Sequence, residues 1–215
     1  MRKLLVFAVL LVSLLPAAVY AQVQFVPVGY SYYTAPEGVG TVTTVVGFLD
    51  PPAGFTYPFS VDFANNEYTF YFQTTITSIV PLAVTTEYHY ANTTFYIYQD
   101  PSKNGTYGTN PPNGTSPSTF RDGTLVLSGD FTDIVRLNYN FGFPQPTALG
   151  TVNFTGGTKL GELSQSNWNF HAGVSATVPG IPAGYKQNWS CKLVPGTVPV
   201  EHTTWGSIKN LYAVD

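Results

Sequence analysis

Apolar and polar residues alternate along most of the chain after its first twenty residues. In the segment 68–76, Phe70, Phe72 and Ile76 fall on one face, and mostly polar residues fall on the other. A period of two is typical of β-strands whose two faces meet different surroundings. The same pattern predicts around ten strands, at approximately 23–28, 41–49, 58–63, 68–76, 86–98, 124–128, 136–141, 148–154, 167–172, 187–193 and 203–213.

The segment 136–141 shows the alternation in its simplest form. Leucine, tyrosine and phenylalanine at 137, 139 and 141 oppose Arg136, Asn138 and Asn140. Helical periodicity is nearly absent beyond the first residues, and 20 Gly and 17 Pro punctuate the chain. These features predict an all-β, antiparallel two-sheet β-sandwich, similar to a jelly roll, with no significant helix.

The first residues have the pattern of a secretory signal peptide. Arg2 and Lys3 precede an apolar run, Leu4–Leu15, and small residues at 19 and 21 predict cleavage after Ala21. The apolar run is shorter than the roughly 20 residues that a membrane span needs. We therefore expect a secreted protein of residues 22–215, with one domain and no membrane span after cleavage.

Only 10% of the 215 residues are charged, and the formal net charge is -3. Without a cluster of Lys and Arg, nucleic-acid binding is not expected. Uncharged strand faces rich in Thr, Asn and Tyr suit contacts with other copies of the chain or with a neutral polymer. The single cysteine, Cys191, allows no intramolecular disulfide; we expect a buried thiol, and an intermolecular disulfide is the alternative.

The segment 99–123 is far longer than an ordinary hairpin loop, and turn-forming residues fill it. Asp100, Ser102 and Asn104 stand at the first, third and fifth positions of a pattern that resembles the opening of a calcium loop. Asp122 is the candidate that closes such a site, because proline occupies the twelfth position. The alternative is a turn held by Asx hydrogen bonds, and calcium is the one cofactor considered. Asp130 and Asp133 are predicted to flank a separate turn.

The predicted mature N-terminus suggests how copies of the chain could associate. Val23, Phe25 and Val28 belong to an extended segment that could complete the sheet of a neighbouring subunit. The alternative is that this segment pairs within its own sandwich as the first strand. The resulting hypothesis is a non-enzymatic structural or adhesive protein, a subunit of a self-assembling extracellular filament or matrix.

A carbohydrate-binding module is the second hypothesis. Tyr88, Tyr90, Tyr96 and Tyr98 stand at strand spacing and could form an aromatic platform for sugar rings. The same residues could equally be part of the core. Extracellular glycans are therefore the alternative partner to self-association.

Five Asn-x-Ser/Thr sequences offer candidate N-glycosylation sites in a secreted protein. They are Asn92, Asn104, Asn113, Asn153 and Asn188.

Nucleophile elbows and phosphate-binding loops are absent from the sequence, so we do not expect an enzyme. A third hypothesis comes from one short strand. The sequence around Glu87 resembles the Glu-Tyr-Tyr strand of compact jelly-roll xylanases, and the chain has a similar length and composition. The resemblance implies Glu87 as nucleophile; Glu201 is its acid/base partner by elimination only, since no matching segment is present.

Overall fold

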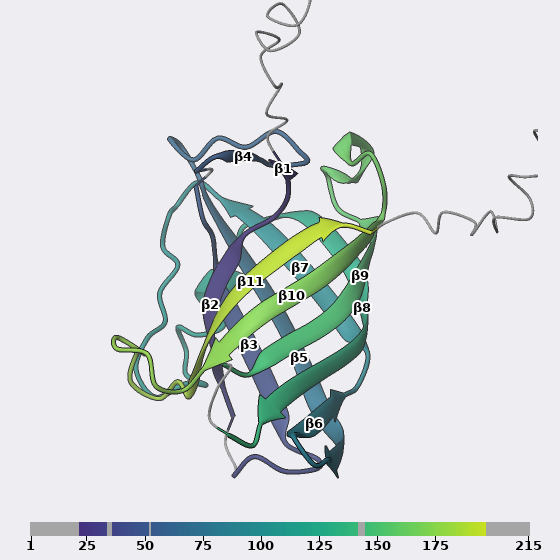
Figure 1. Cartoon of the computed structure of the whole chain (residues 1–215). Coiled ribbons are helices and arrows are strands. Elements are labelled where there is room, and N and C mark those ends of the chain that lie inside the picture. The colour runs from purple at the N-terminus through teal and green to yellow at the C-terminus, as the bar shows by residue number, and fades with distance from the viewer. Residues whose placement is uncertain (1–21, 34–35, 52, 142–144, 197–215) are drawn as a thin grey trace, which may run out of the picture.

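The computed structural model describes residues 22–33, 36–51, 53–141 and 145–196 (Figure 1). Within these ranges the chain forms eleven strands and two short 3-10 helices and has no α-helix. The strands are β1 (Gln22–Val23), β2 (Pro27–Tyr32), β3 (Val42–Leu49), β4 (Phe55–Thr56), β5 (Glu67–Pro81), β6 (Thr85–Tyr90), β7 (Thr93–Asp100), β8 (Thr124–Tyr139), β9 (Thr147–Gly156), β10 (Asn167–Ser175) and β11 (Gln187–Pro195). The 3-10 helices are η1 (Ser118–Phe120) and η2 (Leu160–Glu162).

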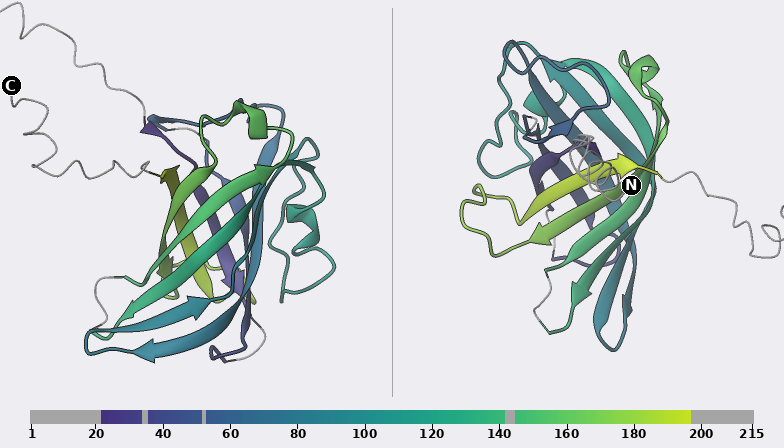
Figure 2. Two further views of the ribbon diagram at one scale, coloured as in Figure 1. Left: turned by 90° about the vertical axis from the view of Figure 1, so that its right-hand side faces the viewer. Right: turned by 45° about the horizontal axis from the view of Figure 1, so that its top comes forward.

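The main sheet closes on itself as an eight-strand antiparallel β-barrel (Figures 1 and 2). Around the ring, β2, β3, β5, β7, β8, β9, β10 and β11 follow one another, and every neighbouring pair is antiparallel. The ring closes where β11 pairs with β2, with Gln187 opposite Ser31 and Ser190 opposite Val28.

The predicted two-sheet sandwich is therefore wrong, although the all-β class is correct. Alternation shows that each strand has a buried face and an exposed face, but it does not show which strands pair. Because the first and last long strands are neighbours, a single sheet encloses one core, and no second sheet is needed.

Two short strands share one place in the ring. The strand β5 pairs with β7 through its first half and with β6 through its second half. The strand β8, on the other side of these two strands, likewise pairs with β7 through its first half and with β6 through its second half. The short strands β6 and β7 run in the same direction and are separated only by Ala91 and Asn92, so together they act as one interrupted barrel strand.

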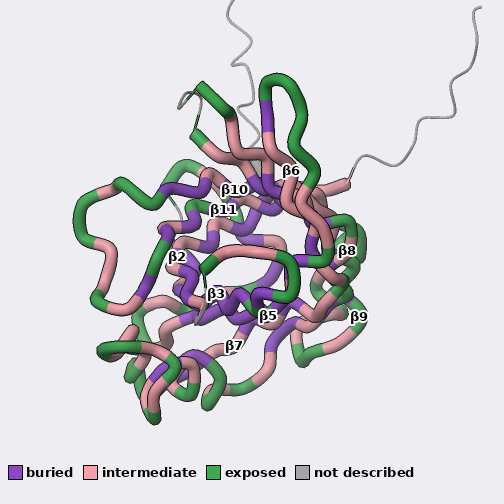
Figure 3. The backbone as a smooth tube through the Cα atoms, turned by 90° about the horizontal axis from the view of Figure 1, so that it is seen from below, coloured by how far each residue is buried: buried purple, intermediate pink, exposed green. Residues whose placement is uncertain are grey.

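Aromatic side chains fill the barrel, and the loops around it carry most of the exposed residues (Figure 3). Phe72 lies near the middle, with Phe95, Phe131 and Trp189 at ring-centroid distances of 5.2–5.9 Å. Large β-formers at alternate positions supply this core, since the inward face of each strand must be apolar along most of its length.

One end of the barrel is closed by the segment 53–66, which includes β4 and lies above the strands in Figure 1. Tyr57 and Phe59 of this segment contact the fully buried Phe25 ring. The centroid of that ring also lies 4.8 Å from the centroid of the Trp168 ring. The segment 58–63, predicted to be a strand, forms part of this apolar cap instead. The other end, near β6, is polar inside.

The long segment 101–123 covers part of the outer face of the barrel, over β2, β3 and β5 (Figure 2). The rings of Tyr107 and Phe120 pack on one another with their centroids 5.2 Å apart. Both also pack on the Phe48 ring, at centroid distances of 5.7 Å for Tyr107 and 5.2 Å for Phe120. Tyr185 joins them from the 176–186 segment and donates a hydrogen bond to the Tyr107 carbonyl at 2.8 Å. The segment therefore has its own small core outside the barrel.

Two predicted segments lie outside the described residues, the signal peptide 1–21 and the strand 203–213. The prediction of a turn between Asp130 and Asp133 is wrong, because both residues belong to the 16-residue strand β8. Asp133 has a positive φ of 54° and lies at a register irregularity, so the local signal marks a bulge within a strand.

Candidate ligand sites

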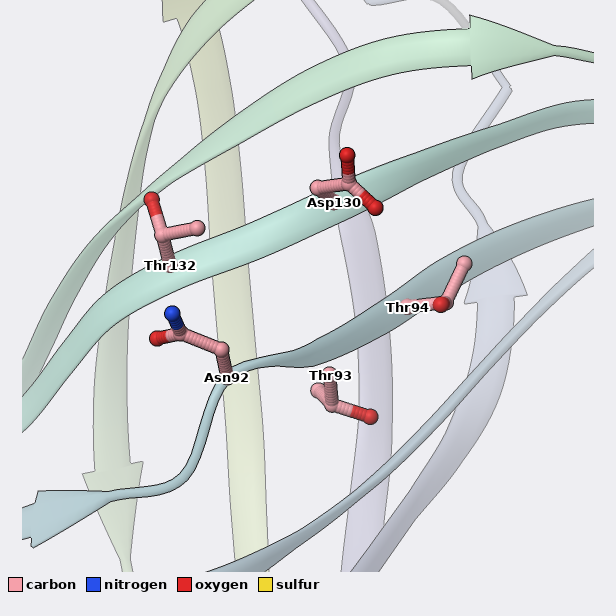
Figure 4. Close-up of a pocket in the computed structure, with 5 residues that line it drawn as sticks. All are labelled: Asn92, Thr93, Thr94, Asp130 and Thr132. Atoms are coloured by element: carbon pink, nitrogen blue, oxygen red, sulfur yellow. The ribbon is translucent and has the colours of Figure 1, made fainter.

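A hollow of about 420 Å³ opens on the outer face of the barrel where two neighbouring strands are irregular together (Figure 4). On one side, β6 gives way to β7 at Ala91 and Asn92. On the other side, the register of β8 shifts between Thr132 and Val135. Because both strands leave regular pairing at the same level, the surface of the sheet is recessed there.

Polar side chains line this hollow. Asn92, Thr93 and Thr94 come from the start of β7, and Asp130 and Thr132 come from β8. Figure 4 shows Asn92 and Thr132 on one side of the hollow and Thr94 and Asp130 on the other. The Thr93 hydroxyl donates to the Gln73 carbonyl at 2.5 Å.

The other four side chains of the hollow have no hydrogen-bond partner among the described residues. They offer two hydroxyls, one amide and one carboxylate to a ligand. This set donates and accepts hydrogen bonds and carries a single charge, so it suits a ligand rich in hydroxyl groups.

Tyrosines continue the same outer face along β7. Tyr96 lies two residues beyond Thr94, and its ring stacks beside that of Tyr98 at 6.2 Å. Tyr71 on β5 is 6.1 Å from Tyr96 and lies under the Arg121 guanidinium, which is 4.7 Å from its ring centroid. A half-buried aromatic row thus borders the polar hollow.

The inner end of the barrel near β6 is organised around Arg136, whose side chain is fully buried. Its Nη1 donates to Glu37 at 2.5 Å and to Gln187 at 3.2 Å, and its Nε donates to Asn138 at 3.0 Å. The Tyr88 ring lies 4.2 Å from the guanidinium carbon. Although burial opposes the charged form, the hydrogen bond to Glu37 helps to raise the pKa of Arg136 above its ordinary value.

The four tyrosines predicted as one sugar platform are divided between the two faces of the barrel wall. Tyr88 and Tyr90 belong to β6 and point into the barrel, whereas Tyr96 and Tyr98 belong to β7 and point outward. The interruption at Ala91 and Asn92 separates the two pairs. Only the β7 pair lies next to the hollow.

The candidate calcium residues form local hydrogen bonds. Asp100 Oδ1 accepts the Ser102 amide at 2.8 Å, which is an Asx turn, and the Asn104 amide donates to Asp122 at 3.0 Å. Glu67, which the sequence analysis did not include, faces Asp100 across the strands and accepts the Gly105 amide at 2.6 Å. Within the described ranges, no group of three or more His, Cys, Asp or Glu side chains is arranged to hold a metal ion. Calcium binding stays a prediction.

The residues predicted for strand addition are used within the chain itself. Phe25 forms a bridge with Leu193, and its ring is in the core. Val28 lies in β2, between β3 and β11, and Val23 is 36% exposed in the short parallel pair of β1 and β4. In this structure the segment pairs within its own chain, and its addition to a neighbouring subunit stays a prediction.

The candidate glycosylation residues differ in their surroundings. Asn92, Asn104 and Asn153 are exposed. The side-chain Oδ1 of Asn113 accepts two backbone N–H groups, and the side-chain Nδ2 of Asn188 donates to the Gly29 carbonyl at 3.4 Å. The Asn104 amide is the group that donates to Asp122. Asn92 itself lines the outer hollow.

Glu87, implied as a nucleophile by the xylanase resemblance, lies on the outward face of β6. Its carboxylate is 3.1 Å from His89. Glu201 lies outside the described residues. Cys191 is buried inside the barrel, where burial raises the pKa of its thiol.

Sequence reasoning missed Thr94, Thr132 and Arg136 as candidate site residues. The signal for Arg136 was present, because an arginine that alternates with apolar residues in a strand must face either solvent or a buried partner. Thr94 and Thr132 carried no such signal, because threonine is common on every strand of this chain.

Comparison with family models, curated proteins and solved structures finds no match for this chain. In the part of the chain that the structure describes, no helix has the length and apolar character needed to cross a membrane.

Proposed function

We propose that this protein is a non-enzymatic extracellular protein that binds neutral glycans in the outer hollow between β7 and β8. The observation that carries the proposal is the set of unpartnered groups in that hollow, on Asn92, Thr94, Asp130 and Thr132. Sugar hydroxyls both donate and accept hydrogen bonds, so this mixed set of groups complements them. The hollow, of about 420 Å³, is wide open to solvent, so it would hold a ligand against one face rather than enclose it.

Two further features support a sugar over a charged ligand. The aromatic row of Tyr96 and Tyr98 continues from the hollow along β7, and sugar rings pack well on aromatic surfaces. The hollow also has no Lys or Arg among its lining residues, so a phosphate or sulfate group would meet only Asp130 as a charged neighbour. A neutral polymer avoids this repulsion.

Self-association stays a prediction, and the structure assigns no surface to it. The strand-addition mechanism required a free N-terminal segment, and this segment forms part of its own barrel wall and core. Polymer formation through this segment would first require the bridge between Phe25 and Leu193 to open.

A glycan array screened with the purified protein, followed by calorimetry on the ligands it detects, tests the proposal. We expect micromolar to millimolar binding of a neutral oligosaccharide, and Asp130→Asn and Thr94→Val should each weaken it by about tenfold. Thr155→Val, an exposed threonine on β9 outside the hollow, is the matched control and should leave affinity unchanged. An array without neutral-glycan binding, or binding that survives both substitutions, would contradict the proposal.

A further inference from the structure

Four buried polar groups at the inner end of the barrel near β6 have no hydrogen-bond partner in the described protein. They are Arg136 Nη2, Tyr90 OH, Thr43 Oγ1 and Trp189 Nε1. None of the four residues is more than 6% exposed. Leaving a buried polar group unpaired costs about 1–3 kcal/mol, so four of them at one end of a barrel call for an explanation.

The four groups come from four strands, β3, β6, β8 and β11, and contacts and strand pairing link these strands in turn. Arg136 on β8 hydrogen-bonds across the barrel to Gln187, two residues before Trp189 on β11. Burial raises the pKa of the Tyr90 phenol, and the positive charge of Arg136 partly offsets this effect, so the two groups lie close enough to interact. Thr43 on β3 and Tyr90 on β6 flank the inward face of β5, where Thr43 pairs with Thr74 and Tyr90 with Ile76.

The chemistry of these groups defines the ligand that they would bind. An arginine Nη2 and an indole N–H can only donate hydrogen bonds, and the two hydroxyls can donate as well. All four requirements are therefore met by oxygen acceptors. A ligand that offers only donors would leave Arg136 and Trp189 unsatisfied.

The charge balance argues for an uncharged acceptor. Arg136 is already paired with Glu37 at 2.5 Å, and the Glu37 side chain is only 17% exposed. A ligand carboxylate would place a second negative charge on the same guanidinium in a buried position, which is unfavourable. Apolar groups surround the polar ones: Tyr88 stacks on Arg136, and Phe72 lies 5.9 Å from Trp189.

We propose that this end of the barrel binds a small, mainly apolar molecule through an uncharged carbonyl oxygen, which accepts hydrogen bonds from Arg136 Nη2 and its unpartnered neighbours. Glu37, Tyr88 and Tyr33 all act on the pKa of the Tyr90 phenol and are only partly buried, so they would form the approach to this inner site. The inner site is separate from the outer hollow, so its existence does not depend on the proposed glycan binding.

The indole N–H signals of ¹⁵N-labelled protein provide a direct test. Trp189 Nε1 is unpartnered, whereas Trp168 Nε1 donates to the Gln165 carbonyl at 3.1 Å and serves as an internal control. We expect acetone or cyclohexanone to shift the Trp189 signal saturably and to leave Trp168 unchanged. Cyclohexane, which has no acceptor, and cyclohexanecarboxylate, which carries a charge, should produce much weaker effects.

Two substitutions separate ligand binding from folding. Tyr90→Phe and Thr43→Val each remove an unpartnered hydroxyl with little change in shape, so the protein should stay folded while ketone affinity falls about fivefold. Tyr98→Phe and Thr75→Val on the outer face are the matched controls.

Three outcomes would overturn the inner-site proposal. They are the absence of a saturable Trp189 shift with both ketones, equal effects from cyclohexane, and stronger binding of the carboxylate. Ketone affinity that is unaffected by both inner substitutions would overturn the assigned contacts.

Discussion

Arg136 on β8 and Gln187 on β11 meet across the inside of the barrel, with Nη1 3.2 Å from Oε1, although β9 and β10 separate their strands in the sheet. The same Gln187 oxygen accepts the Ser31 hydroxyl from β2 at 3.3 Å. The buried Arg136 guanidinium therefore links its own strand, β8, to β11 and β2, and its ion pair with Glu37 links it to the segment between β2 and β3. A charge in this position must be fully compensated, because burial removes its hydration.

Removing the charge of Glu37 should therefore destabilise the fold. We expect Glu37→Gln to lower the free energy of unfolding by about 2–3 kcal/mol, somewhat less than for a fully buried pair because Glu37 retains some solvent contact. Replacing both partners, Arg136→Met with Glu37→Gln, should recover most of this loss, relative to Arg136→Met and Glu37→Gln alone. Urea unfolding of the two single variants and the double variant gives the comparison.

If the two single substitutions have additive effects on the free energy of unfolding and the double variant shows no recovery, Arg136 and Glu37 do not stabilise the fold as a coupled pair. Lys159→Met provides the surface control, since Lys159 and Glu162 form an exposed pair at 2.8 Å. Its unfolding midpoint should be indistinguishable from that of the unmodified protein.

Phe25→Ala should be among the most destabilising single substitutions in the chain. The ring is fully buried and contacts Tyr57, Phe59, Phe154 and Trp168. The resulting cavity should cost about 3–5 kcal/mol in unfolding free energy, measured by urea denaturation. Val23→Ala, at a partly exposed position in β1, should change stability by less than about 0.5 kcal/mol. Similar small effects at both positions would indicate that the N-terminal segment is not docked in the barrel.

Gly47→Ala tests how closely β2 and β3 approach. A Cβ atom at Gly47 would lie 2.5 Å from the Gly29 Cα on the neighbouring strand and 2.7 Å from the Phe70 ring. Backbone and a packed ring cannot both yield, so we expect a loss of about 1–3 kcal/mol. Gly161→Ala is the control, because nothing lies within 4 Å of its added Cβ. Equal stability of the two variants in thermal and urea unfolding would contradict this packing.

Cys191 should be unreactive in the folded protein. Its thiol is buried, and burial raises its pKa above the ordinary value of 9.0, so the thiolate is disfavoured in the native state. A thiol reagent should modify it only after denaturation, while an engineered Thr155→Cys reacts at once. Rapid modification of native Cys191 would place the thiol at the surface.

The same thiol makes stability dependent on alkaline pH. The pKa of the Cys191 thiol is higher in the folded protein than in the unfolded chain. The contribution of this thiol to the free energy of unfolding is therefore complete below pH 9.0, and it is lost as the pH rises and the thiol ionises in the unfolded chain. Between about pH 8.5 and 9.5 the stability of Cys191→Ala should decline less steeply than that of the unmodified protein, because the tyrosine contribution is the same in both. Parallel slopes for the two proteins would count against this linkage.

The alternation of residues was sufficient to predict most strands, but not which face lies inside. In 136–141 the apolar residues oppose Arg136 and Asn138, and the polar face is the one that points inward at the end of the barrel. Phe141, on the apolar face, is 77% exposed. Tertiary context reversed the usual relation between polarity and burial at this end.

Closure of the barrel and the outer hollow were beyond sequence reasoning for a related reason. Ser31 and Gln187 pair across a separation of more than 150 residues, and neither carries a signal for the other. The hollow depends on two irregularities that coincide in space, at Asn92 and at Thr132. Each irregularity has an unremarkable local sequence, and only their juxtaposition creates the recess.

A closed ring of antiparallel neighbours has no intrinsic first strand. Because Phe25 bridges Leu193, the two ends of the described chain lie at the same end of the barrel, beside the cap formed by 53–66. A circular permutant that links Gln22 to Gly196 through a short spacer, and begins instead within the turn around η2, would keep every strand beside its present neighbours. The order of the strands along the chain is therefore separable from the order in which they stand in the wall.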